Sequence, residues 1–320
     1  MNTPLHPNLS GETVPYGGWP NCYRLTNGVI DLVITLDVGP RVIRAGFVGQ
    51  ANLFYEHPDH VGLQGGAEWR LYGGHRLWCA PEAKPRTYYP DNEPVALEER
   101  LEDQTPFVRV TAPVETTTGI QKQLDLTLWP DHNHVRVTHR LYNRGMWPVD
   151  LAPWALSVMK PGGVAVVPLP PRGEHPRDLL PSSTLALWPY TDLSDPRWTW
   201  GRRHILLRQD AQAPQPQKFG ASVSEGWAAY VVDGYAFVKC FRHQPEARYP
   251  DLESSVEVFT NQAMLELETL GPLARLDNGA TVEHTEDWFL FDNVPTPERD
   301  DEVDDTVGRR VGEARALLTP

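Results

Sequence analysis

The sequence has 320 residues, a formal net charge of −13 at pH 7 and 40% hydrophobic residues. That hydrophobic content is enough for a sizeable core, and β-sandwiches or barrels of more than ~200 residues commonly fold as one domain. The acidic balance, without a Lys/Arg cluster, argues against nucleic acid as a partner, because binding to a phosphate backbone depends on basic side chains.

The sequence also carries signals about the compartment. Met1–Pro7 has neither the basic start nor the apolar segment of a secretory signal, and no run approaches the ~18 apolar residues of a membrane-spanning helix. Cys22, Cys79 and Cys240 are widely separated and odd in number, which favours a reducing compartment and offers no CxxC metal pattern. We therefore expect a cytoplasmic protein with no membrane partner.

Residues 1–20 are rich in Pro, Gly and Asn, and this composition predicts a lead-in coil. The first predicted strands follow it. Over 30–36, Ile and Leu occupy alternate positions, and this period of two is typical of a strand. Gly-Pro and Gly-Gln turns then separate two more predicted strands, 41–48 and 51–56.

Strands continue along the rest of the chain, separated by polar, proline-bearing loops over 84–94 and 210–218. The further predicted strands are 107–112, 120–129, 135–143, a pair within 152–168, 227–232, 235–241, 254–259, 263–270, 273–276, 281–285 and 288–292. Helical periodicity occurs only over 300–318, in a C-terminal tail that we place at 300–320. The pattern predicts an all-β fold, a large antiparallel sandwich or barrel forming a single domain over 1–320.

The segment Trp69–Glu82 combines features that suit ligand binding. Gly73-Gly74 lets the backbone turn or be approached closely, and His75, Arg76 and Trp78 follow it directly. An arginine fork and a flat aromatic ring are groups that can hold sugar hydroxyls and sugar faces. The alternative is a loop in which the tryptophan fills core and the arginine pairs with a nearby glutamate.

A second candidate is the pair Glu266 and Glu268, which share one face of an extended strand while Leu265 and Leu267 share the other. Two adjacent carboxylates raise each other's pKa, and a carboxylate raised toward neutrality is a competent general base. The alternative is an ordinary solvated face.

Two other polar residues are candidate substrate-binding groups. Lys239 lies within an apolar strand and points either inward or, as strand lysines usually do, outward. His243 follows at the end of that strand and is either a site residue or a surface histidine. His132 and His134 lack a third ligand nearby, so we expect no metal, and the nucleotide-binding and serine-hydrolase motifs are absent, so we expect no cofactor.

The residues Gly73–Pro81 and Glu266–Pro272 resemble two stretches of the galactose-mutarotase-like superfamily. The first is similar to a Gly-Gly…Trp-Pro segment of the hexose-6-phosphate mutarotase branch, and the second to the late strand that carries the catalytic glutamate of aldose 1-epimerases. Over roughly 20–292 the chain resembles most closely a bacterial family of unknown function within that superfamily.

The resemblance implies a two-sheet supersandwich with a cleft for a small-molecule carbohydrate, to which the periodicity over 300–318 adds a short C-terminal helix. In known members a glutamate takes the proton of the anomeric hydroxyl and a histidine protonates the ring oxygen. Carried over by position, Glu268 is the candidate base and Glu266 the second candidate, Arg76 orients the substrate, and His75 and Trp78 line the cleft. We expect a monomer or homodimer.

The chain departs from the epimerase pattern where the acid histidine is expected. The corresponding segment, Pro153–Ser157, contains no histidine. Two hypotheses follow from this departure. Either His75 or His243 supplies the acid from another strand and the protein is an aldose 1-epimerase-like isomerase, or it is a non-catalytic carbohydrate-recognition protein.

Overall fold

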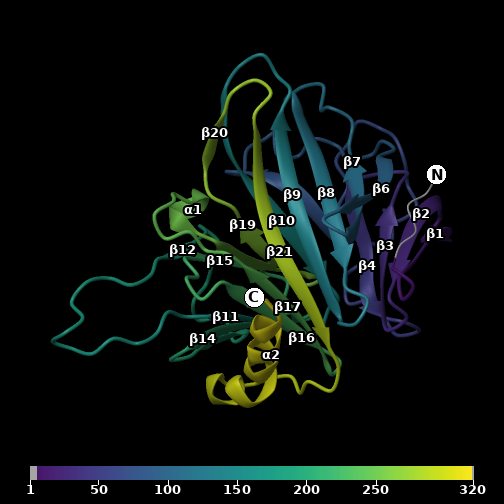
Figure 1. The fold of residues 1–320 in the computed structure, drawn as a ribbon. Coiled ribbons are helices and arrows are strands. Elements are labelled where there is room, and N and C mark those ends of the chain that lie inside the picture. Colours follow the sequence, from purple (N-terminus) through teal and green to yellow (C-terminus); the bar gives the residue numbers. More distant parts are fainter. Residues whose placement is uncertain (1–5, 319–320) are drawn as a thin grey trace.

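The computed structural model describes residues 6–318. Two large sheets lie face to face, and their strands pair antiparallel throughout (Figure 1). The prediction of an all-β antiparallel fold is therefore confirmed. No helix within residues 6–318 combines the length and apolar character needed to cross a membrane.

The first sheet has 11 strands and forms the wall that carries the candidate site. In spatial order its strands are β1 (Ser10–Tyr16), β2 (Trp19–Thr26), β3 (Ile30–Thr35), β4 (Arg41–Phe47), β5 (His75–Ala80), β10 (Val149–Met159), β19 (Leu265–Leu270), β18 (Val256–Thr260), β15 (Gln217–Ala221) and β12 (Leu185–Leu187), with β20 (Ala274–Leu276) paired to β10.

The second sheet has 10 strands. In spatial order they are β13 (Trp198–Trp200), β14 (His204–Arg208), β11 (Val164–Pro168), β16 (Trp227–Val232), β17 (Tyr235–Phe241), β21 (Thr281–Phe291), β9 (His134–Asn143), β8 (Ile120–Leu128), β7 (Thr105–Thr111) and β6 (Ala96–Glu102).

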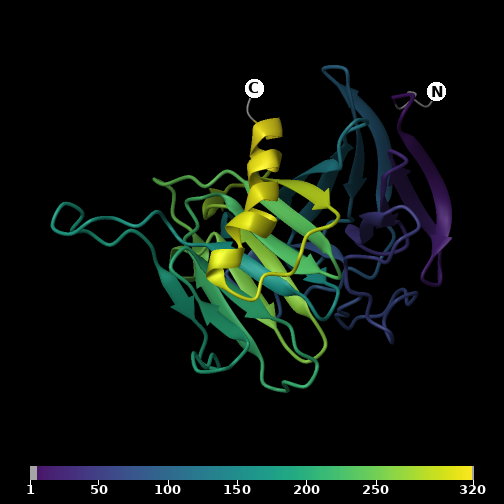
Figure 2. The same cartoon turned by 90° about the horizontal axis from the view of Figure 1, so that it is seen from below.

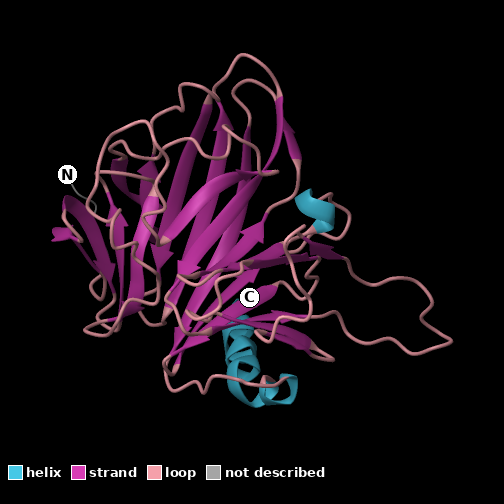
Figure 3. Cartoon of the chain, turned by 180° about the vertical axis from the view of Figure 1, so that it is seen from behind, coloured by secondary structure: helices cyan, strands magenta, loops and turns pink. Residues whose placement is uncertain are grey.

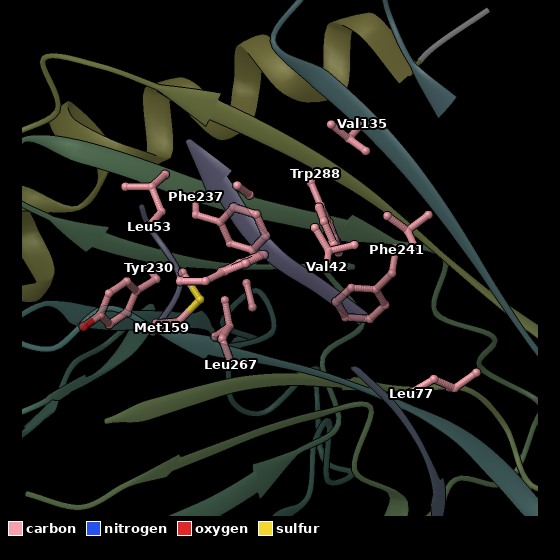
Figure 4. Packing of buried hydrophobic residues seen from close by; sticks show 14 of the residues in the cluster. Val42, Leu53, Leu77, Val135, Met159, Tyr230, Phe237, Phe241, Leu267 and Trp288 are labelled. Carbon is pink, nitrogen blue, oxygen red and sulfur yellow. The ribbon is translucent and has the colours of Figure 1, made fainter. Parts of the chain in front are cut away.

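The hydrophobic core lies between the two sheets because alternate side chains of each central strand point inward. Val42 and Leu267 come from the first sheet, and Phe237 and Trp288 from the second (Figure 4). The rings of Phe237 and Trp288 pack with their centroids 5.4 Å apart. Removing these inward-facing side chains from water is the main driving force that holds the sheets together.

The C-terminal tail covers the outer face of the second sheet, as Figure 2 shows. It consists of two short turns, η1 (Asp300–Glu302) and η2 (Asp304–Gly308), and the helix α2 (Arg309–Leu318), while a separate helical turn, α1 (Pro250–Glu253), lies elsewhere. Val303, Val307 and Val311 recur at four-residue spacing and pack in one cluster with outward-facing residues of the sheet. The predicted C-terminal helix is thus confirmed.

The expected lead-in coil over 1–20 is wrong for much of that range. β1 begins at Ser10 and forms an edge hairpin with β2, which begins at Trp19. The hairpin forms because the Trp19 ring is buried against Tyr72 and Gly17 and Gly18 adopt the positive φ angles of the turn. Residues 1–5 lie outside the described range.

Further differences concern individual strands. The predicted strand over 51–56 forms only isolated bridges, Phe54 with Met159 and Glu56 with Gly73. β6 was not predicted because its sequence is mostly charged, and it lies at the edge of the second sheet. β21 runs unbroken over Thr281–Phe291, where two strands were expected. The connection over 169–184 has no strand or helix and projects from the body of the molecule (Figure 3).

Gly73 and Gly74 position the start of β5 through close backbone approach. Both have positive φ, 103° and 68°, and a Cβ at Gly74 would lie 2.3 Å from the carbonyl oxygen of Val42. The Gly74 N–H donates to the carbonyl oxygen of Tyr55 at 2.9 Å. The sequence-based argument that these glycines allow close approach is confirmed.

We expect Gly74→Ala to lower the free energy of unfolding by at least ~3 kcal/mol, because it adds a steric clash to the strain of a left-handed backbone. Gly279→Ala is the matched control, since Gly279 has a φ of 79° but no atom within 4 Å of its Cβ position. The control should lose only about 1 kcal/mol. Urea denaturation of both variants checks this, and equal losses would contradict it.

Candidate functional site

Strand alternation divides the residues of β5 between two environments. Arg76 and Trp78 lie on the face of the first sheet that points away from the second sheet, whereas His75 and Leu77 point into the space between the sheets. The same alternation places Glu266 on the outer face and Leu267 in the core.

A cleft of about 300 Å³ opens on this outer face. Half of its lining residues come from β5, β10, β15, β18 and β19, and half from neighbouring loops. The cleft is lined by Trp69, Leu71, Arg76, Trp78, Glu82, Tyr88, Trp154, Leu156, Tyr190, Lys218, Phe259, Asn261, Met264 and Glu266. The prediction that Arg76 and Trp78 lie at such a cleft agrees with this geometry.

Four aromatic rings form one wall of the cleft. The Trp78 ring lies 5.5 Å from that of Trp69, 5.0 Å from that of Tyr88 and 5.4 Å from that of Trp154, measured between centroids. Trp78 and Trp154 are buried, and Trp69 and Tyr88 are half-buried. Such packed, rigid rings present flat apolar faces at low entropic cost.

Arg76 and Glu266 form an ion pair within the cleft, with Nη2 of Arg76 donating to Oε1 of Glu266 at 2.8 Å. The guanidinium carbon lies 4.4 Å from the centroid of the Trp78 ring, an arrangement in which cation and π-face attract. Nε and Nη1 of Arg76 are buried and have no hydrogen-bond partner. Unpaired buried donors are costly, so this free edge suits a ligand that supplies acceptor oxygens.

Glu268 does not line the cleft, although it shares a face with Glu266. Its side chain is fully buried, and Oε2 accepts hydrogen bonds from Nε1 of Trp154 at 2.7 Å and from Nζ of Lys218 at 3.4 Å. These two side chains separate it from the cleft. The alternative of a solvated face is wrong for both glutamates, since Glu266 is only 8% exposed.

Lys218 also pairs with Glu257, whose Oε2 lies 2.7 Å from Nζ. Glu257 and Glu268 are directly opposite each other on β18 and β19. Burial raises the pKa of both carboxyls, against the opposing effect of the Lys218 charge. Burial alone would lower the pKa of Lys218, but the two carboxylates outweigh it and raise the pKa.

The prediction that His75 lines the cleft is wrong, because His75 and Arg76 are consecutive in a strand and point to opposite faces. His75 is fully buried between the sheets. Its Nδ1 lies 2.9 Å from the Ser157 hydroxyl and its Nε2 lies 2.7 Å from Nε2 of His139. It cannot reach a sugar in the cleft.

The contacts of His75 and His139 settle which nitrogens carry protons. His139 donates from Nδ1 to the backbone carbonyl of His284 at 2.9 Å, so its Nε2 accepts from Nε2 of His75, and Nδ1 of His75 accepts from Ser157. Burial lowers the pKa of both His75 and His139, so both rings are neutral at pH 7. The pair is a satisfied hydrogen-bond chain that crosses from one sheet to the other.

Lys239 points inward, toward the first sheet, and the prediction that it binds substrate is wrong. Its ammonium is fully buried and donates to Oε1 of Glu286 at 2.8 Å and to the carbonyl oxygens of Leu267 at 3.0 Å and Ala155 at 3.3 Å. Three N–H groups thus have three acceptors, which is how a buried cation avoids an unpaired donor.

Glu286 joins this network from β21. Burial alone would raise its pKa, but the Lys239 ammonium and neighbouring histidines outweigh burial and lower it. Its oxygens also accept from Thr269 at 2.5 Å and from the Trp288 indole at 2.7 Å. Donor atoms of His75, His139 and Glu286 come within 4.8 Å of one another, but these existing hydrogen bonds already occupy them.

His243 lies away from the cleft. It lines a separate surface pocket with Tyr249, and the two rings stack with centroids 5.1 Å apart. The prediction that it contributes to the sugar cleft as acid or binding residue is wrong, because its strand belongs to the second sheet. No histidine lines the cleft in the part of the chain that the structure describes.

Sequence reasoning missed Lys218, Glu257 and Trp154. The sequence predicts a polar loop over 210–218 that includes Lys218, but β15 begins at Gln217. The alternation of Lys218 with the apolar Phe219 is the signal that indicates a strand there. Glu257 lies in a predicted strand, where its alternation with buried valines could have placed it on the same face as Lys218.

A larger groove, of about 620 Å³, lies at the C-terminal tail and is lined by Arg203, His204, Trp227 and Asp300 among others. The Asp300 carboxylate accepts from the backbone N–H of Arg202 and from Nδ1 of His204. Arg203 forms an ion pair with Asp304. These charges hold the tail against β14, and no described residue that lines the groove has a buried polar atom without a hydrogen-bond partner.

We expect Lys239→Met to destabilise the fold by about 3–5 kcal/mol, because it leaves the Glu286 carboxylate buried without its cation. The double variant Lys239→Met/Glu286→Gln should recover part of that loss. Urea denaturation of the two single variants and the double variant forms the cycle. Additive losses would contradict the coupling.

Stability should fall as pH drops below ~6.5. Burial lowers the folded-state pKa of three histidines, His75, His139 and His284, and brings that of His284 to about 3. These side chains therefore stabilise the fold above the unfolded pKa of ~6.5. They lose that contribution as pH falls toward the folded-state pKa values. Each contributes about 1.4 kcal/mol per pH unit within this window.

Urea denaturation at pH 7, 6 and 5 measures this slope. His139→Asn should reduce it, whereas His132→Asn, at an exposed position, should leave it unchanged. Equal slopes in the two variants would show that the buried ring does not contribute.

Comparison with known proteins places the fold. No model of a known protein family matches the sequence, and no curated protein matches it either. A TPR-domain-containing protein from Parabacteroides distasonis superposes with a TM-score of 0.57 and 13% identity over 86% of this chain. The match covers 48% of that protein, so the chain spans about half of its length.

Two other solved structures match over most of both chains. A candidate aldose 1-epimerase from Klebsiella pneumoniae has a TM-score of 0.54 and 13% identity, covering 89% of this chain and 83% of its own. A galactose mutarotase-like protein from Lactobacillus casei has a TM-score of 0.53 and 8% identity, covering 85% and 100%. At sequence identities of 8–13%, these structural similarities establish the fold of the chain. The resemblance to a bacterial family of unknown function, inferred from the sequence, stays a prediction. The chain has the galactose-mutarotase-like fold.

Proposed function

We propose that the protein binds a carbohydrate in the cleft and acts on its anomeric centre by acid–base chemistry. The observation that carries this proposal is the Arg76–Glu266 pair, which lies beside the Trp78 ring with two guanidinium nitrogens unpartnered. A sugar ring that stacks on the aromatic wall can offer its hydroxyl oxygens to these donors.

Glu266 is the proposed general base, in place of Glu268. Its carboxylate lines the cleft and keeps Oε2 available while Oε1 accepts from Arg76. Glu268 is the poorer candidate because Trp154 and Lys218 lie between it and the cleft. A base must come within hydrogen-bond reach of the proton that it takes, so accessibility decides between the two.

The charges of the cleft favour an uncharged sugar. Arg76 is balanced by Glu266, and Lys218 by Glu257 and Glu268. Glu82, at the rim, accepts a hydrogen bond from the Tyr88 hydroxyl. With its cations already paired, the cleft has no surplus positive charge to offset a phosphate or carboxylate group.

A second candidate function is carbohydrate recognition without catalysis. It is favoured by the lack of a histidine among the described residues that line the cleft. The fold is shared with a candidate aldose 1-epimerase and a galactose mutarotase-like protein, which supports a sugar ligand for either function.

Glu266→Gln should slow anomeric equilibration by ~10²-fold or more, because the amide cannot accept the hydroxyl proton. The measurement is NMR of freshly dissolved α-glucose and α-galactose with and without protein. Glu98→Gln, an exposed position on β6, is the control and should retain the full rate.

Binding is measured separately, through the change in tryptophan fluorescence on adding each sugar. A fluorescence change without any acceleration by the wild-type protein would support recognition alone. If neither signal appears with either sugar, the proposal fails for both. An unchanged rate in Glu266→Gln would reject Glu266 as the base.

A further inference from the structure

Three buried charges lie directly under one end of the cleft. Lys218 on β15 extends its ammonium between the carboxyls of Glu257 on β18 and Glu268 on β19, at 2.7 Å and 3.4 Å. Both carboxyls are fully buried, and the Lys218 side chain is 6% exposed. Both oxygens of Glu257 and Oε1 of Glu268 have no hydrogen-bond partner, so the group is not a fully satisfied structural ion pair.

Two tryptophans hold the Lys218 ammonium in place. Nζ lies 4.7 Å from the centroid of the Trp154 ring and 4.6 Å from that of the Trp188 ring. Nζ donates a hydrogen bond to Oε2 of Glu268, whereas Glu257 lies within ion-pair distance without accepting one. The Lys218 side chain lines the cleft, so its remaining N–H groups are available to a ligand.

Lys218 and Glu266 occupy opposite sides of the space that a sugar would fill. Lys218 is paired with Phe259 in the register of β15 and β18, and Phe259 with Glu266 in the register of β18 and β19. The two residues are therefore two strands apart, roughly 10 Å between backbones. All three side chains line the cleft.

We propose that Lys218 is the general acid of the cleft, the role that a histidine fills in the epimerases, and that it protonates the ring oxygen while Glu266 takes the anomeric proton. This inference rests on the proposed function. The C1–ring oxygen bond breaks as Nζ gives its proton to the ring oxygen, and the anomeric O–H proton passes to Glu266 as the C1 carbonyl forms. Ring closure on the other face of the carbonyl reverses both transfers.

The buried carboxyls can resupply the proton that Lys218 gives up. Ionised carboxylates raise the pKa of Lys218 and hold its proton, but two directly opposed buried carboxyls do not readily ionise together. A proton retained on either glutamate can pass to Nζ as the ammonium gives up its own. Glu257 and Glu268 are thus positioning residues that keep Lys218 charged.

The other proton carriers that line the cleft fit the role less well. Arg76 is a guanidinium, which does not deprotonate in proteins. The Tyr88 hydroxyl already donates to Glu82. Tyr190 remains as the competing acid, since it lines the cleft and is partly exposed, so it enters the experiment as the comparison.

The experiment measures kcat and KM for the anomeric equilibration of α-glucose and α-galactose, with sugar binding followed by tryptophan fluorescence. Lys218→Arg keeps the positive charge but cannot release a proton, and Lys218→Met removes both. We expect both to lower kcat by ~10²-fold or more and Lys218→Arg to bind sugar within a few-fold of wild type. The distant Lys160→Arg is the control and should keep kcat within about twofold, and Tyr190→Phe tests the competing acid.

Glu257→Gln tests the positioning role. It should lower kcat by at least about tenfold with KM unchanged, whereas a merely structural loss would alter thermal stability and leave kcat of the folded fraction intact. Circular dichroism checks that each variant is folded. If Lys218→Met does not fold, Lys218→Arg alone tests the acid role of Lys218.

The outcomes separate the two proposals. Wild-type activity that persists in Lys218→Arg overturns the acid role while leaving the proposed function standing. Loss in Tyr190→Phe with full activity in Lys218→Arg assigns the acid to Tyr190. A wild-type protein that accelerates neither sugar overturns the enzymatic function and the acid role together.

Discussion

The central strands of the first sheet separate two kinds of polar chemistry, because consecutive side chains must point to opposite faces. On the inner face, the network of His75, His139, Lys239 and Glu286 joins the sheets through satisfied hydrogen bonds. On the outer face, Arg76 retains unpartnered nitrogens beside Glu266. The position of a polar residue along its strand, odd or even, thus decides whether its side chain lies between the sheets or on the face that carries the cleft.

Burying the charges of Lys239 and Glu286 between the sheets costs free energy, and the hydrogen bonds of the network offset that cost. A buried ion pair contributes little net stability unless every donor and acceptor is paired, and Lys239 meets that condition with one carboxylate and two backbone carbonyls of the facing sheet. Since hydrophobic contacts tolerate sliding and these hydrogen bonds do not, we infer that the network also sets the register of one sheet over the other.

On the outer face, polar groups without hydrogen-bond partners lie at a cleft. The aromatic rings, Arg76 with its unpartnered nitrogens, and Lys218 all line this cleft of about 300 Å³. Lys218 differs from Lys239 in this respect: both are buried ammoniums beside carboxylates, but only Lys218 lines a cleft and has carboxyl oxygens nearby without partners. That contrast is why one is assigned to structure and the other to chemistry.

The sequence by itself determined the fold class and two of the segments that contribute to the cleft, those of Arg76 and Glu266, because period-two alternation and Gly-Pro turns are local signals. It also determined that Glu266 and Glu268 share a face. Only the tertiary structure decided that Trp154 and Lys218 cover Glu268, that His75 and Lys239 face the second sheet, and that Glu257 lies opposite Glu268. These facts depend on which strands become neighbours, and strand pairing joins residues more than 100 positions apart, such as Trp154 and Leu270, which no local pattern encodes.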